Sequence, residues 1–139
     1  MARIVLTDAY VKLNNVDLSD HIASVEIAQS FDAVETTAFG DSGRTRTGGL
    51  EDSSITLSFH QDFASGSVDA TIAPLVGGTA AFEIRAIGTA AGTVSPTNPK
   101  WTGIVLVTEW SPLSGAVGEL STADVTWPVS GQVTRGTAP

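Results

Sequence analysis

Two stretches of the chain, Ile22–Phe31 and Glu51–Gln61, alternate between apolar and polar residues. A period of two is typical of a β-strand with one buried and one solvated face. We therefore predict two long strands here and expect their polar residues to share a solvated face. These residues are Ser24 and Glu26 in the first stretch and Ser54, Thr56, Ser58 and His60 in the second.

A long loop separates these two predicted strands. The segment Phe39–Gly49 reads FGDSGRTRTGG, contains four glycines and shows no hydrophobic periodicity, which predicts irregular structure. It is also longer than the usual connection within a hairpin. Because a buried core has no use for such a loop, contact with a partner is the first functional hypothesis. The residues that carry this hypothesis are Gly40, Asp41, Arg44, Arg46, Gly48 and Gly49.

The basic residues of this loop have two interpretations. Arg44 and Arg46 are two of only seven lysines and arginines in the chain. They either stay solvated or pair with carboxylates on a neighbouring copy of the same chain. Arginine suits the second role because its planar fork binds a carboxylate through two hydrogen bonds. The residues alone leave both interpretations open.

The remaining pattern predicts one short helix and further strands. Val68, Ile72 and Leu75 are spaced four and three residues apart, which favours an amphipathic helix with Ser67 as N-cap and Pro74 near its end. Strands are predicted at Ile4–Leu6, Ala9–Leu13, Val34–Ala38 (after a bulge near Asp32), Thr79–Ile87, Trp101–Trp110 and Leu120–Val133, with a loop at Gly88–Lys100.

Two of these strands carry information about the sheets. Trp101–Trp110 is apolar on both faces, which is typical of a central strand covered twice. Pro128 has no main-chain donor, so Leu120–Val133 is expected to have an edge or a bulge there. Together the elements predict a mainly β protein, a two-sheet β-sandwich or partial barrel with one short flanking helix and a long inter-strand loop, in a single domain over residues 1–139.

The charge of the chain is acidic, with 7 Lys and Arg against 15 Asp and Glu and a net charge of −8. Such a surface disfavours adhesion to nucleic acid, whose backbone is also negative, but from charge alone the better explanation is that it keeps the protein soluble. No apolar run approaches the roughly 20 residues of a membrane helix. The start, MARIVLTDAY, has no secretory pattern, so we expect synthesis in the cytoplasm and no membrane partner.

A search for catalytic or metal-binding motifs finds none. The chain has no cysteine, and its two histidines, His21 and His60, have no second ligand nearby in sequence. No serine lies in a GxSxG nucleophile elbow, and the glycines at Gly40 and Gly43 lack the lysine of a phosphate-binding loop. We therefore predict no enzyme, no cofactor and no metal site.

The tryptophans leave a competing hypothesis open. Trp101, Trp110 and Trp127 are expected in the core or at an interface. Trp101 and Trp110 lie at the two ends of a predicted strand, where sugar-stacking rings also occur. The alternative function is therefore a carbohydrate-binding β-sandwich module or adhesin.

The chain resembles the major tail proteins (tail tube proteins) of long-tailed bacteriophages, especially actinobacterial ones. The likeness covers nearly the whole chain, and the order of its segments carries it rather than any single motif. The segments are LSDHIASVEI (18–27), ETTAFGDSGRTRTGGLEDSSITLSFHQDFASGSVDATIAPLVG (35–77), TNPKWTGIVLVTEWSPLSG (97–115) and VGELSTADVTWPVSGQVTR (117–135).

This resemblance implies a structural virion protein of the phage tail, assembled in the host cytoplasm. Its subunits would form hexameric rings that stack into a hollow tube, through which genome DNA passes without specific binding during ejection. The Phe39–Gly49 loop would contact neighbouring subunits or rings, and the six polar strand residues named above would line the inner wall. Further partners implied are a tape measure protein, a tail terminator and distal tail or baseplate proteins.

Overall fold

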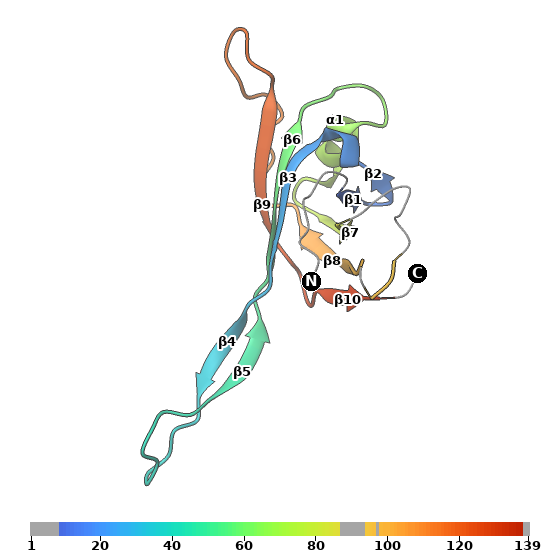
Figure 1. Ribbon diagram of the computed structural model, residues 1–139. Helices are drawn as coiled ribbons and strands as arrows, with labels where there is room; N and C mark the ends of the chain where they lie inside the picture. Colours follow the sequence, from blue (N-terminus) through green and yellow to red (C-terminus); the bar gives the residue numbers. More distant parts are fainter. Residues whose placement is uncertain (1–8, 87–93, 97, 138–139) are drawn as a thin grey trace.

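The computed structural model describes residues 9–86, 94–96 and 98–137. In this part of the chain, strands dominate and a single short α-helix is present (Figure 1). The strands are β1 (Tyr10–Leu13), β2 (Val16–Asp17), β3 (Ile22–Ala28), β4 (Phe31–Glu35), β5 (Arg46–Glu51), β6 (Ser54–His60), β7 (Thr79–Arg85), β8 (Lys100–Leu106), β9 (Thr122–Pro128) and β10 (Thr134–Gly136). The helical elements are α1 (Val68–Ile72) and the 3₁₀ turns η1 (Ser19–His21) and η2 (Ala73–Leu75).

The strands form three antiparallel sheets. The first has the order β10-β8-β7-β1-β2, the second the order β3-β6-β9, and β4 pairs with β5 alone. The first two sheets face each other, while β4 and β5 extend away from them as a long hairpin (Figure 1). The predicted mainly β, two-sheet architecture with one flanking helix is confirmed.

The core lies between the inner faces of the two larger sheets. Phe59 and Trp127 are its largest fully buried side chains, and their rings lie 6.3 Å apart. Each buried side chain of this size contributes about 1.5–3 kcal/mol of hydrophobic stabilisation. The inner face of the three-stranded sheet comes from alternate residues of β6 and β9, namely Ile55, Leu57, Phe59, Ala123, Val125 and Trp127. The period-two pattern therefore identified this face correctly.

The helix α1 covers one end of the core with Val68 and Ile72, as predicted. It is shorter than the sequence pattern indicates and continues as the 3₁₀ turn η2, where Pro74 lacks a main-chain donor. Ser67 occupies the N-cap position, but its hydroxyl makes no capping hydrogen bond and instead donates to Asp62 over 2.8 Å.

The prediction that Phe39–Gly49 is an irregular loop is partly wrong. Residues 46–49 belong to β5, which pairs with β4 across a bulge between Phe31 and Ala33. The bulge confirms the prediction near Asp32. Glycine here does not mark a turn, because Gly49 allows close packing of the two strands: a Cβ there would lie 2.9 Å from Val34 Cγ2.

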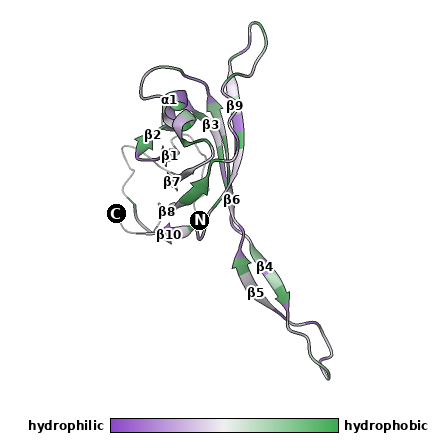
Figure 2. Cartoon of the chain, turned by 180° about the vertical axis from the view of Figure 1, so that it is seen from behind, coloured by the Kyte–Doolittle hydropathy of each residue, from purple (hydrophilic) through white to green (hydrophobic). Residues whose placement is uncertain are grey.

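The prediction that Trp101–Trp110 is covered on both faces is also wrong. The strand β8 ends at Leu106, and its outward residues Ile104 and Leu106 are 47% and 38% exposed. The five-stranded sheet has a partner sheet on its inner face only, so the outward half of the apolar pattern stays open. Figure 2 shows β8 as a hydrophobic strand in this sheet.

Several predicted strand ends also differ from the observed ones. Ala28 ends β3, so the first long stretch divides into β3 and β4, and β4 ends at Glu35 rather than Ala38. Pro128 ends β9, and the rest of that predicted strand turns away before β10. Since β9 is an outer strand of its sheet, the expectation for Pro128 is confirmed. The predicted strand Ile4–Leu6 and most of the loop Gly88–Lys100 lie outside the described residues.

Candidate functional site

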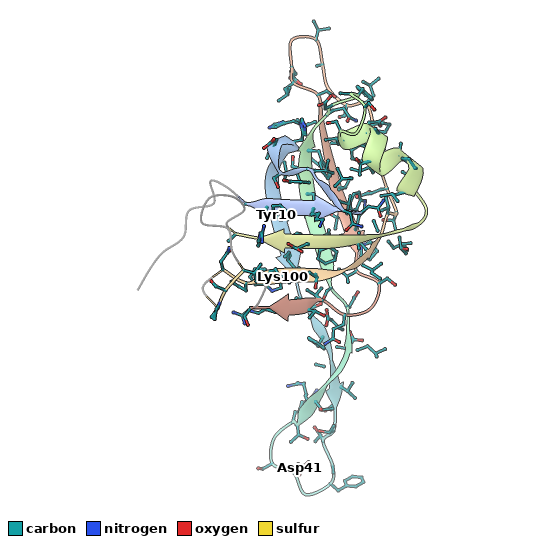
Figure 3. The ribbon with its side chains drawn as sticks, turned by 90° about the vertical axis from the view of Figure 1, so that its right-hand side faces the viewer. Tyr10, Asp41 and Lys100 are labelled. Atoms are coloured by element: carbon teal, nitrogen blue, oxygen red, sulfur yellow. The ribbon has the colours of Figure 1, made fainter. Side chains whose placement is uncertain are left out.

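The β4–β5 hairpin, called here the arm (residues 31–51), is the most exposed part of the described chain. Every residue from 29 to 48 is exposed, and Phe39 near its tip has no cover at all. Figure 3 shows Asp41 at the far end of the arm, well away from the body that holds Tyr10 and Lys100. A segment with so little buried surface gains little from folding alone, so its length points to contacts outside the subunit.

Local hydrogen bonds shape the tip of the arm. The Asp41 carboxylate accepts a hydrogen bond of 2.7 Å from the Ala38 N–H, and Gly40 adopts a φ of +93°, which suits glycine. The Thr36 and Thr45 hydroxyls lie 2.9 Å apart below the turn. The connection between β4 and β5 is therefore an ordered turn of residues 36–45.

The arginines of the arm have weak partners within the chain. Arg44 Nη1 lies 3.9 Å from Glu35 Oε1, and the two side chains are 72% and 52% exposed. Solvent screening leaves such a pair about 0–1 kcal/mol of stabilising energy. Arg46 stands opposite Glu35 in the strand register. Both guanidinium groups therefore remain accessible to carboxylates of another molecule.

The six predicted polar residues lie together on the outer face of the three-stranded sheet. The register pairs Ser24 with Ser58 and Glu26 with Thr56, while Ser54 and His60 continue the same face of β6. The third strand of this face, β9, was not among the predicted site residues. Thr122, Asp124 and Thr126 of β9 complete it, with Ser58 donating a 2.6 Å hydrogen bond to Asp124. Their alternation was visible in the sequence, but the pairing of β9 with β6 was not.

The three-stranded sheet has two edge strands within the described chain, and its only bridge to the other sheet there lies just after β9, where Val129 pairs with Val105 of β8. β3 forms one edge and β9 the other, with β6 between them. Main-chain N–H and C=O groups on such edges are ready to pair with another strand. The arm continues from β3 and β6 at one end of this sheet, so edges and arm belong to one continuous surface (Figure 1).

Exposed apolar side chains also gather at the end of the three-stranded sheet that lies opposite the arm. The loop between β8 and β9 projects beyond the body there, on the far side from the arm (Figure 1). Its residues Leu113, Val117 and Leu120 are exposed, as is Phe63 after β6. The two ends of the sheet thus carry unlike projections, each with exposed apolar side chains.

A cluster of polar groups near α1 has the residue types of a hydrolase site. His21 Nε2 lies 3.2 Å from the Ser67 hydroxyl and 3.5 Å from Asp62 Oδ2. The Ser67 proton, however, is committed to Asp62, and hydrogen bonds from the Ala64 N–H and Ser67, together with the charge of His21, lower the pKa of that carboxyl. Because Asp62 and Ser67 approach the same imidazole nitrogen, the cluster links η1 to α1 and does not form a relay to a nucleophile.

Two of the tryptophans contact the core through specific groups. Trp110 meets Phe59 edge-on, with ring centroids 5.6 Å apart, and its indole N–H donates to Asp69 over 3.3 Å. Trp127 is fully buried, and Trp101 packs against the core opposite Ile84. The expectation that these rings belong to the core is confirmed for Trp127, and the other two are half-buried against it.

Comparison with known proteins identifies the fold. No protein-family model matches the chain, and no curated protein matches it. A chain in the virion of a native gene transfer agent particle aligns with 96% of this chain and 98% of its own, at a TM-score of 0.73 and 14% identity. The chain shares that fold.

Two further structures agree with this result. A chain in the tail of an empty gene transfer agent particle, with C6 symmetry, has a TM-score of 0.60 at 14% identity and covers 82% of this chain and 81% of its own. A chain in the six-fold symmetrised baseplate of the anti-feeding prophage has a TM-score of 0.55 at 12% identity and covers 97% of both chains.

Two searches of the described residues return nothing. No three His, Asp or Glu side chains gather there as a metal site. No helix in that part of the chain has the length and hydropathy needed to cross a membrane.

Proposed function

We propose that this protein is a structural tail protein of a phage or phage-derived particle, which self-assembles into hexameric rings stacked as a hollow tube. The observation that carries the proposal is the three-stranded sheet, whose outer strands β3 and β9 have no partner strand along their length in the described chain, extended by the arm. The shared fold supports it, because similar chains occur in the tail of one particle with C6 symmetry and in a six-fold baseplate of another.

In the proposed ring, β9 of one subunit pairs with β3 of the next. This contact joins two different edges, so repeating it generates a closed ring when the rotation closes. Closure satisfies the main-chain groups of both edges and produces one continuous barrel from the sheets of all subunits. Six copies are proposed from the symmetry of the similar particles.

The polar outer face of the same sheet would then line the lumen. Among the described residues, this face carries the carboxylates of Glu26 and Asp124 and no lysine or arginine. Hydroxyl groups and carboxylates offer phosphate groups no cation to bind, and the carboxylates repel them. Genome DNA would therefore pass along the wall without adhering to it during ejection.

The arm would connect each subunit to its neighbours or to the next ring. A head-to-tail stack brings the arm towards the opposite end of another copy, where Leu113 and Val117 are exposed. Arg44 and Arg46 on the arm would meet the acidic Glu119 of that end.

We propose a tape measure protein, a tail terminator and distal tail or baseplate proteins as further partners. The virion tail would be assembled in the cytoplasm of the host, which we propose to be an actinobacterium.

Electron microscopy of the purified protein, before and after concentration, tests this proposal. We expect rings or hollow tubes of uniform width. A variant in which residues 36–45 are replaced by a two-residue turn should remain folded and form no stacks. Small particles that never form rings, together with binding to a glycan array, would instead favour the carbohydrate-binding alternative.

A further inference from the structure

Glu109 accepts two hydrogen bonds from residues of β9, one of them from the outer edge of the strand. Its carboxylate accepts a hydrogen bond of 2.9 Å from the Thr126 N–H. Its main-chain carbonyl accepts a second bond, 2.8 Å long, from the indole N–H of the buried Trp127. The first of these bonds occupies a donor of an edge strand.

The strand register explains why this donor is available. In an antiparallel pair, alternate residues direct their main-chain groups towards the partner and away from it. Because the Thr126 N–H reaches Glu109, residues 122, 124, 126 and 128 of β9 direct theirs away from β6. Pro128 has no N–H. In the last part of this edge, one donor is therefore covered and the next is missing.

The main chain that carries Glu109 is fixed, while its side chain reaches the edge from the surface. Val107 is fully buried, and its N–H and C=O groups bond to Gly78 and Gly77 over 2.9 and 2.8 Å. Trp110 is held by Asp69 and Phe59. The exposed carboxylate of Glu109 can thus leave Thr126 by side-chain rotation alone, without unfolding any neighbouring segment.

The opposite edge has no such cover. Carried across both registers, the same alternation directs the main-chain groups of Val25 and Ile27 in β3 outward. In the described part of the chain, no side chain is hydrogen-bonded to either N–H group. The two edges that would meet between subunits therefore differ: one is open and the other is capped.

We propose that Glu109 is an edge latch, which covers the β9 edge of the free subunit and must rotate away before a strand of a second copy can pair there. The inference rests on the proposed ring contact between β9 and β3. The partner strand replaces the carboxylate with a main-chain carbonyl at the Thr126 N–H. The latch therefore slows the first pairing step and leaves the finished ring with the same number of hydrogen bonds.

Substitution of Glu109 tests the latch by comparison with a matched site. Glu109→Ala removes the carboxylate, whereas the Trp127 contact survives because it uses the main-chain carbonyl. Asp20→Ala is the control, because it removes one exposed carboxylate from η1, outside β9 and outside the loop that carries Glu109. Self-association is followed by sedimentation velocity and light scattering, and the products are imaged. Hydrogen exchange of the Thr126 amide in the free subunit reports the cap itself.

The expected result is faster exchange at Thr126 and association of Glu109→Ala at about tenfold lower concentration than the wild type, as for loss of one charge-assisted hydrogen bond. Asp20→Ala should behave as the wild type. If Glu109→Ala forms strand-paired oligomers but no rings, the latch stands and the proposed ring is wrong. If Glu109→Ala and Asp20→Ala associate equally, the latch is wrong, whether or not rings form.

Discussion

Gly49 of β5 lies so close to Val34 of β4 that a Cβ on the glycine would approach Val34 Cγ2 to 2.9 Å. The same Cβ would lie 3.2 Å from Asp32 Cβ and 3.3 Å from the Asp32 carbonyl oxygen. This contact sits at the base of the arm, next to the bulge between Phe31 and Ala33. It sets how closely β4 and β5 pack against each other where the arm joins the body.

Gly49→Ala should therefore destabilise the arm. The added methyl group meets side-chain and main-chain atoms that have little room to move, at a cost of about 1–3 kcal/mol. Gly48→Ala is the matched control, since a Cβ at Gly48 has nothing within 4 Å. Hydrogen exchange of the β4 and β5 amides measures the effect. Equal exchange in both variants would contradict the packing role of Gly49.

Charge reversal on the arm should reduce assembly and leave subunit stability unchanged. Arg44→Glu with Arg46→Glu removes both guanidinium groups, and the exposed pair with Glu35 at 3.9 Å is worth only about 0–1 kcal/mol. Lys12→Glu, on β1 of the body, is the comparison. Light scattering should show weaker assembly for the arm variant than for Lys12→Glu. A matching loss in both would mean that the arm arginines are only solvated.

The cluster around Asp62 should make stability depend on acid pH. Its folded-state pKa lies below the ordinary value of 3.8, chiefly because the Ala64 N–H and the Ser67 hydroxyl donate to the carboxylate. A lowered folded pKa means that this contribution is present above the unfolded pKa and is lost as pH falls through the folded pKa.

Thermal unfolding of wild type and Asp62→Asn, measured between about pH 7 and pH 2, tests this dependence. We expect the wild type to be the more stable protein near neutral pH and the difference to shrink as the carboxyl is protonated. Asp20→Asn serves as a control, since Asp20 is an exposed carboxylate of the neighbouring turn η1. A difference that persists unchanged at the acid end would show that Asp62 acts through packing rather than charge.

Truncation of two neighbouring residues of β8 should change the free energy of unfolding by very different amounts. Val105 is fully buried and Ile104 is 47% exposed. Val105→Ala should lower the free energy of unfolding by about 2 kcal/mol, because it leaves a cavity between the sheets. Ile104→Ala should change it by less than about 0.5 kcal/mol in the free subunit. Chemical denaturation of both variants measures these changes. A large drop in the free energy of unfolding of Ile104→Ala would mean that the outer face of β8 is buried in the free subunit.

The sequence pattern predicted those parts of the fold that depend on local periodicity. The alternation in β6 located Ile55, Leu57 and Phe59 in the core and Ser54, Thr56 and Ser58 on the opposite face. The apolar run in β8 was equally clear, but it reports only which residues are apolar. Whether a second layer covers Ile104 depends on the partner of the sheet, which local sequence does not encode.

The candidate site divides in the same way. Glycine content pointed to the region of the arm but not to its form, because the ladder between β4 and β5 outweighs the weak strand propensity of Gly48 and Gly49. The polar residues of β3 and β6 were found, whereas Asp124 needed the pairing of β6 with β9. The contact between Glu109 and Thr126 joins a loop to a strand edge and left no periodic signal.

The exposure of the arm also provides a natural cleavage assay. Arg44 and Arg46 lie in a segment in which every residue from 29 to 48 is exposed, so trypsin should cut the free subunit there first. If neighbouring copies cover the arm, as proposed, the same bonds should become inaccessible. The two fragments on a gel would then measure how much of a preparation is still unassembled, without any label or microscope.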